Sequence, residues 1–257
     1  MTQSCFQPKA IKTARDVSVF EVNSDSVIVV GCDSAGGIGP KPLDTIKVSG
    51  YTLGRFTARV ALMEVFAVGA TPFCLTNTLG VEPDPTGFEI VEGIKHEVKL
   101  AGLEASLTLI GSMEKTVAVE QTGIGVTVAG LTSKKGLKMG LSKPDDLLVT
   151  IGIPSVKDGV LPAEERGEIA DLEDVLKLIN CDFVHDVIPV GSQGILHEVN
   201  VLAKDCGLCA NLQLSNVEAK MSAGPATAVV VSVSKTALTE LSGLINKPIR
   251  VIGSFCS

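Results

Sequence analysis

Residues 27–47 read Val-Ile-Val-Val-Gly-Cys-Asp-Ser-Ala-Gly-Gly-Ile-Gly-Pro-Lys-Pro-Leu-Asp-Thr-Ile-Lys. The β-branched run 27–30 predicts a buried strand that ends in a glycine-containing loop. The loop carries, in order, a carboxylate, three glycines, a lysine and a second carboxylate: Asp33, Gly36, Gly37, Gly39, Lys41 and Asp44. Glycines let backbone N–H groups approach an anion closely. The stretch therefore fits a site for a metal-bound phosphate, and it also fits a surface turn with a solvated lysine.

Two common nucleotide-binding motifs are excluded. The P-loop spacing Gly-x-x-x-x-Gly-Lys-Ser/Thr fails because Pro42 follows Lys41. The dinucleotide fingerprint Gly-x-Gly-x-x-Gly is not matched either. A nucleotide bound at this stretch is therefore held by a different architecture.

The composition is that of a globular protein without a nucleic-acid surface. The 257 residues suffice for one large or two modest domains, with 45% apolar and 20% charged residues. Eight Phe, one Tyr and no Trp argue against stacking platforms for single-stranded nucleic acid. The net charge of −7 disfavours partners such as nucleic acid or an anionic membrane. A nucleotide bound through divalent cations stays compatible with this charge.

Compartment signals favour the cytoplasm. The N-terminus lacks the apolar core of a signal peptide, and no run approaches the roughly 18 apolar residues of a membrane span. Seven cysteines without disulfide spacing indicate a reducing compartment. Cys206 and Cys209 form one C-x-x-C motif, for which the sequence supplies no redox or metal partners. The basic residues of segment 1–16 fit either a solvated terminus or an arm that folds over a bound phosphate.

The chain mixes strands and helices in two halves, which predicts an α+β fold. In the first half we expect helices at 54–69 and 86–101, and strands at 17–22, 27–30, 46–48, 71–79, 106–110 and 121–131. The lysine-rich segment 132–143 is the best linker candidate and divides domain 1–135 from domain 136–257. The second half predicts helices at 171–180, 195–206 and 235–244, and strands at 144–152, 208–214, 227–233 and 249–253.

Helix 54–69 carries an acidic residue on its apolar side. Apolar side chains recur at helical spacing at Phe56, Val60, Met63 and Ala67, and Glu64 follows Val60 by one turn. A carboxylate on such a stripe costs several kcal/mol unless it is paired or metal-bound. Glu64 is therefore a candidate metal ligand.

Asp33 and Glu114 are further candidates, because each follows a predicted buried strand. Mg²⁺ prefers hard oxygen ligands and bridges carboxylates to phosphates. Phosphoryl transfer needs mainly positioning and charge neutralisation, for which the available cations are Lys41, Arg59 and Lys115. Two further carboxylates, Asp44 and Asp186, fit helix caps, turns or surface ion pairs equally well.

The order of these motifs resembles the ATP-binding superfamily of aminoimidazole ribonucleotide synthetase, thiamine-monophosphate kinase, selenophosphate synthetase and hydrogenase-maturation dehydratase proteins. Segment 55–72 is similar to the part of those enzymes with an acidic metal ligand followed by Gly-Ala-x-Pro; Glu64 stands where they usually have Asp. Segment 111–116, Gly-Ser-Met-Glu-Lys-Thr, resembles their Gly-Gly-Asp/Glu-Thr, and segment 185–196 resembles their second-domain segment with Asp and a glycine pair.

Within the superfamily the chain most resembles the α-ribazole kinases. The similar segments are 14–17, 33–41, 59–64 and 111–114. The family pattern has Asp-Asn-Ser-Gly-x-Ile-Gly in the loop and Gly-Ser-Thr-Glu later, so Ser34, Ala35 and Met113 depart from it. Substrate identity is therefore less well supported than the fold.

The resemblance implies two α/β domains of the aminoimidazole ribonucleotide synthetase type and a homodimer whose N-terminal strands form a barrel across the interface. It implies that ATP binds between the glycine loop and this interface. The implied reaction transfers the ATP γ-phosphate to the 5′-hydroxyl of α-ribazole, giving α-ribazole 5′-phosphate for the lower loop of cobalamin. Alternatives are the same fold with another acceptor, thiamine monophosphate or an ATP-activated amide, and a non-catalytic nucleotide-binding protein.

The resemblance also suggests roles for individual residues. Mg²⁺ would be held by Asp33, Glu64 and Glu114. ATP would contact Asp33, Gly36, Gly37, Gly39, Lys41 and Asp44. Catalytic charge contacts would come from Lys41, Arg59 and Glu114, and substrate contacts from Asn77, Lys115 and Asp186.

Overall fold

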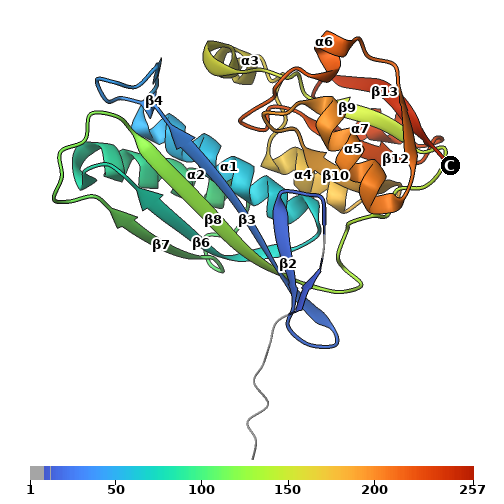
Figure 1. Cartoon of the computed structure of the whole chain (residues 1–257), viewed down its shortest axis with the longest axis horizontal. Coiled ribbons are helices and arrows are strands. Elements are labelled where there is room, and N and C mark those ends of the chain that lie inside the picture. The colour runs from blue at the N-terminus through green and yellow to red at the C-terminus, as the bar shows by residue number, and fades with distance from the viewer. Residues whose placement is uncertain (1–8, 12) are drawn as a thin grey trace, which may run out of the picture.

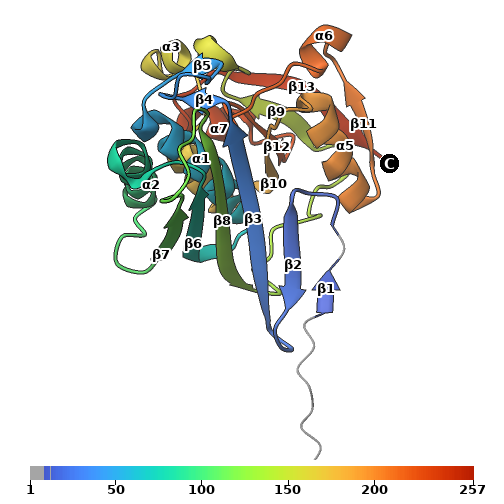
Figure 2. The ribbon, with the colours of Figure 1, turned by 60° about the vertical axis from the view of Figure 1, so that its left-hand side comes forward.

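The computed structural model describes residues 9–11 and 13–257. Its first sheet has six strands in the order β1-β2-β3-β8-β6-β7 (Figures 1 and 2). These are β1 (Lys9–Ile11), β2 (Val17–Glu21), β3 (Ser26–Gly36), β8 (Gly123–Ser133), β6 (Thr71–Leu79) and β7 (Thr108–Met113). Neighbouring strands are antiparallel except β6 and β7, which run parallel.

Helices α1 (Gly50–Ala67) and α2 (Phe88–Leu100) cover one face of this sheet (Figure 1). α1 begins after Ser49, whose side chain accepts a hydrogen bond from the backbone N–H of Thr52. The two helices cross closely: a Cβ at Gly54 would lie 2.0 Å from the carbonyl oxygen of Ile90. The crossing therefore requires glycine at this position.

The second sheet has five antiparallel strands in the order β10-β12-β9-β13-β11. They are β10 (Val184–Pro189), β12 (Val229–Val233), β9 (Leu147–Ile151), β13 (Ile249–Cys256) and β11 (Cys209–Leu212). The helices of this half are α3 (Val160–Glu165), α4 (Leu172–Ile179), α5 (Ile195–Cys206), α6 (Asn216–Ala219) and α7 (Leu238–Leu244).

Both faces of the second sheet are packed. Val149 and Val231 join the core that contains α1 and α4, whereas Leu148 and Val230 join the cluster that contains α5. Adjacent residues of one strand point to opposite faces, so helices on both faces explain why β9 and β12 are buried along their length. The larger core is continuous between the two sheets.

Short elements complete the fold. β4 (Ile38–Gly39) and β5 (Ile46–Lys47) form a two-stranded parallel ladder beside the N-terminus of α1. A π-helical turn, Pro83–Gly87, precedes α2, and a 3₁₀ turn, Lys157–Gly159, precedes α3. No helix in the described part of the chain is long and apolar enough to cross a membrane.

The predicted α+β fold with two sheets is confirmed. The main correction concerns the opening stretch: the strand predicted at 27–30 runs from Ser26 to Gly36, so Asp33 lies inside a strand and not at the start of a loop. The strand continues because β8 pairs with it through Gly36. The division at residue 135, the barrel and the homodimer stay predictions, and residues 1–8 and 12 of the predicted basic arm lie outside the described chain.

Candidate functional site

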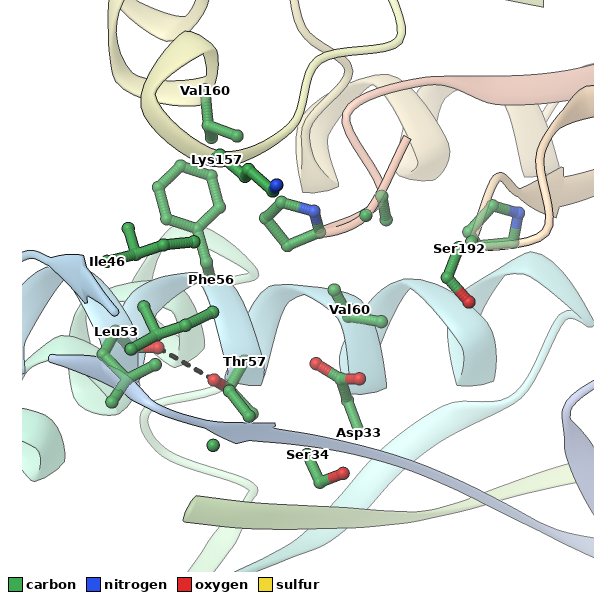
Figure 3. Close-up of a pocket in the computed structure, with 18 of the residues that line it drawn as sticks. Asp33, Ser34, Ile46, Leu53, Phe56, Thr57, Val60, Lys157, Val160 and Ser192 are labelled. Carbon is green, nitrogen blue, oxygen red and sulfur yellow. Dashed lines mark hydrogen bonds between the residues drawn. The ribbon is translucent and has the colours of Figure 1, made fainter. Parts of the chain in front are cut away.

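A cavity of about 530 Å³ lies where the N-terminal half (residues up to 135) faces the C-terminal half (Figure 3). Its N-terminal wall comes from the end of β3, the β4–β5 segment and one side of α1. Its C-terminal wall comes from residues 157–161 and the turns 189–192 and 224–226. Cavities of this size hold small ligands and cofactors. We therefore take it as the candidate site.

β3 has an unpaired edge along this cavity. β2 pairs with β3 only from Val27 to Gly31, whereas β8 pairs with the other edge as far as Gly36. Residues 32–36 all line the cavity, and within residues 9–11 and 13–257 they have no strand partner on that side. The alternate backbone N–H and C=O groups of such an edge are available for hydrogen bonds. The predicted phosphate cradle is thus replaced by a strand edge.

Carboxylates gather at one end of the cavity, where Asp33 on β3, Glu64 on α1 and Asp16 before β2 line the wall. Burial, together with the neighbouring carboxyl groups of Glu198 and Asp16, raises the pKa of Glu64 from 4.5 to about 8. Burial also raises the pKa of Asp33 to about 6 and that of Glu198 to about 7. Such groups lack compensating positive charge, which a bound cation supplies.

The three predicted Mg²⁺ ligands are not brought together. Asp33 and Glu64 share the cavity, whereas Glu114 lines a separate cavity of about 360 Å³ at the ends of β6 and β7. Among the described residues, no group of three or more His, Cys, Asp or Glu is arranged to hold a metal ion. Asp33 and Glu64 fit a cation that takes its other ligands from phosphate or water, as Mg²⁺ commonly does.

The other end of the cavity is apolar. Leu53, Phe56 and Val60 on α1 face Val160 and Leu161 at the start of α3. In Figure 3, Phe56 and Val160 lie together at one side and Asp33 lies away from them. Phe56 and Val160 also share one small apolar cluster, which joins the two halves. A ligand that fills the cavity therefore meets an acidic end and an apolar end.

The glycine segment is a tight turn beside the cavity. Gly37 and Gly39 have φ angles of +71° and +146°, and the N–H of Gly37 donates to the carbonyl oxygen of Thr122 at 3.0 Å. Asp44 is buried and accepts hydrogen bonds from the N–H of Lys41 and from the N–H and Oγ1 of Thr122, at 2.7–2.8 Å. Asp44 thus holds this turn together, and its cofactor contact stays a prediction. Of the three glycines, only Gly36 lines the cavity.

The predicted catalytic cations are engaged elsewhere. Lys41 pairs with Glu82 and does not line the cavity. Arg59 is only 2% exposed and donates to Glu97 at 2.9 and 3.1 Å and to Glu164 at 2.9 Å. This guanidinium therefore ties α1 to α2 and α3, and its catalytic role stays a prediction.

The Asp186 carboxylate is also hydrogen-bonded within the fold. It accepts hydrogen bonds from Arg15 and from the N–H groups of Leu141 and Ser142, the last two at 2.9 and 2.7 Å. Arg15 also donates to the carbonyl oxygen of Val187 at 2.7 Å. Asp186 thus has partners within the fold, its substrate contact stays a prediction, and Arg15 belongs to the interior and not to a solvated terminus.

The remaining predicted residues lie near the second cavity or in the sheet. Asn77 is buried, and its Nδ2 donates to the carbonyl oxygen of Ile110 at 3.1 Å. The hydroxyl and N–H of Thr116 and the N–H of Val117 lower the pKa of Glu114 to about 2. Lys115 is exposed beside Glu114 and lines neither cavity.

Sequence reasoning missed several cavity residues, among them Asp16, Lys157 and Ser192. Asp16 directly precedes the strand that begins at Val17, whereas Asp33 was singled out because it follows a predicted strand, so the same signal did not identify Asp16. Lys157 and Ser192 lie in turns without periodicity, and only the tertiary fold brings them to the cavity.

Comparison with known proteins agrees with this architecture. Residues 14–132 match the family described as AIR synthase related protein, N-terminal domain. The selenide, water dikinase of Yersinia pestis is 24% identical over 233 residues, which cover 84% of this chain and 64% of that enzyme. The chain thus spans less than two thirds of the length of this curated relative.

Solved structures share the fold. PurL of T. maritima, complexed with ADP, superposes with a TM-score of 0.68 and 17% identity, covering 97% of this chain and 43% of that one. Thiamine-monophosphate kinase from Stenotrophomonas maltophilia K279a gives a TM-score of 0.64 and 16% identity, covering 96% of this chain and 89% of that one. The family match covers residues 14–132, less than half of the chain, and the solved structures show that the whole chain shares their fold.

Proposed function

We propose that this protein is an ATP-dependent kinase that phosphorylates the 5′-hydroxyl of α-ribazole in cobalamin nucleotide-loop assembly. The observation that carries the proposal is the cavity between the halves, which joins half-buried carboxylates to an apolar wall along an edge of β3. In the proposed reaction the bond from the γ-phosphorus to the bridging oxygen breaks and leaves ADP. A bond to the 5′-oxygen forms, and the hydroxyl proton passes to water.

ATP and Mg²⁺ as cofactors are supported by the acidic end. The pKa values of its carboxylates are raised, as expected for metal ligands that lack their cation. Asp33 and Glu64 would hold Mg²⁺, which would neutralise phosphate charge when bound. Because Glu64 holds a proton up to about pH 8, cation binding at neutral pH would release protons. One structural relative is complexed with ADP, and another is named thiamine-monophosphate kinase. Both are consistent with ATP binding by this fold.

The acceptor is supported by the apolar end. α-Ribazole carries an uncharged, apolar bicyclic base, which matches Leu53, Phe56, Val160 and Leu161 better than a charged ring would. Burying such a ring against aliphatic side chains contributes roughly 25 cal/mol per Å². Thiamine monophosphate, whose thiazolium ring is charged, would lose solvation at the same place.

The predicted homodimer is supported by the other face of the first sheet. Phe73, Ile110 and Leu131 are 41%, 54% and 47% exposed there, on three adjacent strands. Apolar side chains gathered on one sheet face commonly mark an interface. Replacing Leu131 by Lys is expected to convert a dimer to monomers in analytical ultracentrifugation; a wild-type chain that is monomeric at all concentrations would remove the dimer from the proposal.

The test is a purified-protein assay with Mg·ATP and a panel of acceptors. We expect ADP and α-ribazole 5′-phosphate, the latter identified by mass spectrometry, and no product with Glu64→Gln. ADP formation with thiamine monophosphate and not with α-ribazole would show that the acceptor is wrong. Mg²⁺-dependent ATP binding without turnover on any riboside or phosphate ester would identify a non-catalytic nucleotide-binding protein.

A further inference from the structure

We propose that Lys157 is the residue of the C-terminal wall that contacts the phosphoryl group in the cavity. The inference rests on the proposed kinase function and deepens it, because it names a catalytic residue that neither the sequence motifs nor the resemblance contains. Lys157 lies in the turn between β9 and α3, and its side chain projects into the cavity in Figure 3.

The carboxylates that line the cavity repel a bound phosphate, so the phosphate needs a positively charged partner there. The described residues that line the cavity include the carboxylates of Asp16, Asp33 and Glu64, and Lys157 is the single Lys or Arg among these described residues. A phosphate placed between these walls therefore has Lys157 as its only side-chain cation from the lining, apart from any bound metal. An ammonium donor to a phosphate oxygen forms a charge-assisted hydrogen bond.

The ammonium group is also free for this contact. Within the described chain, no hydrogen bond or ion pair involving the Lys157 side chain is found. By contrast, Lys41 and Arg59, the cations predicted from the sequence, are held by Glu82 and Glu97 outside the cavity. Lys157 therefore takes the place that the sequence analysis assigned to them.

The backbone at Lys157 is held in a costly conformation. Its φ is +53°, in the left-handed region, which costs a residue with a Cβ free energy relative to glycine. The described chain has three such non-glycine residues, Asp145, Lys157 and Ala226, and the last two line this cavity. Backbone strain persists at functional sites, where a side chain is needed despite the cost. Retaining lysine where glycine would fit better points to a role for the ammonium group.

The experiment compares Lys157→Met, Lys157→Arg and Lys157→Gly with the control Lys235→Met. Lys235 is an exposed lysine of the same half that does not line the cavity, so its variant matches the change in net charge. We expect Lys157→Met to lower kcat/KM by about 10- to 100-fold, as for loss of one charge-assisted hydrogen bond, with partial recovery in Lys157→Arg and no change in the control.

Lys157→Gly separates function from structure. Glycine adopts the left-handed conformation readily, so this variant should keep or raise the wild-type Tm while losing as much activity as Lys157→Met. A lysine retained only for the turn would give a Gly variant with unchanged kcat/KM. That result, or a Met variant within about twofold of the wild type, would overturn the proposal.

Binding measurements keep this proposal distinct from the kinase assignment. Pyrophosphate with Mg²⁺ is titrated calorimetrically into the wild type and Lys157→Met. If no acceptor is phosphorylated but the Met variant binds pyrophosphate about tenfold more weakly, the kinase assignment fails and Lys157 keeps its role. If phosphorylation proceeds and both kinetics and pyrophosphate binding are unchanged by the Met substitution, Lys157 has no such role and the kinase stands.

Discussion

Replacing Glu64 by Gln is expected to change how the stability of the protein depends on pH. The pKa of Glu64 rises from 4.5 to about 8 on folding, because the carboxyl is buried and lies near Glu198 and Asp16. The folded state thus binds the proton more tightly than the unfolded state. This contribution to stability is fully present below about pH 4.5 and is lost as the pH rises through about 8. Gln has a similar shape and does not titrate.

The magnitude follows from the change in pKa. At about 1.4 kcal/mol per pH unit, a rise from 4.5 to about 8 corresponds to on the order of 5 kcal/mol. Glu64 lines a cavity open to water, so we expect about half of this effect or less. Between about pH 5 and pH 9, the free energy of unfolding of the Gln variant should gain about 2 kcal/mol relative to the wild type.

Urea unfolding of both proteins at about pH 5, 7 and 9, with a chelator present, measures this difference. Glu104→Gln is the control, because Glu104 is exposed and should give a difference that does not vary with pH. A Glu64→Gln difference that is equal at all three pH values would refute the reasoning. Adding Mg²⁺ at about pH 9 should then raise the Tm of the wild type and not of the Gln variant, by linkage to the cation.

Three substitutions test structural roles by urea unfolding. Asp44→Ala should cost about 2–3 kcal/mol, because the buried N–H of Thr122 loses its acceptor; stability like that of the wild type would leave Asp44 free for a ligand. Arg59→Met should cost about 2–3 kcal/mol, because the buried Glu97 loses two charge-assisted hydrogen bonds and keeps only Arg55 among the described residues, and the double variant with Glu97→Met should recover much of this; no recovery would mean that the pair is not the cause. Gly54→Ala should lower Tm sharply, since its Cβ would lie 2.0 Å from a backbone oxygen, and a Tm equal to that of the wild type would contradict this packing.

Periodicity and glycine punctuation were sufficient to predict most of the fold. The apolar spacing of helix 54–69 and the β-branched runs at 71–79 and 227–233 depend on local sequence, and the structure has these elements within a few residues. Glu64 was identified because a carboxylate on an apolar helix face needs an explanation. Its position in the cavity wall, with a pKa of about 8, supplies one.

The parts that could not be predicted depend on contacts between distant segments. A lysine or arginine in a sequence looks the same whether it is free or paired, and Arg59 is paired with a glutamate 38 positions away. The Asp186 carboxylate accepts a hydrogen bond from Arg15, which lies 171 positions earlier in the chain. The length of β3 depends on β8, and Lys157 reaches the cavity through the turn before α3. None of these pairings leaves a local pattern.

The buried Arg15 has a consequence for how the protein can be divided. Its guanidinium bonds to Asp186 and, at 3.2 Å, to Asp205, so the segment before β2 is built into the C-terminal half. A fragment beginning at residue 136 would keep both carboxylates and lose their cation, leaving an uncompensated buried charge. Deletions that stop short of Thr13 leave this pair intact. Shortening the N-terminus past Arg15 therefore removes the counterion of the C-terminal half, and the tolerated deletions end just before this residue.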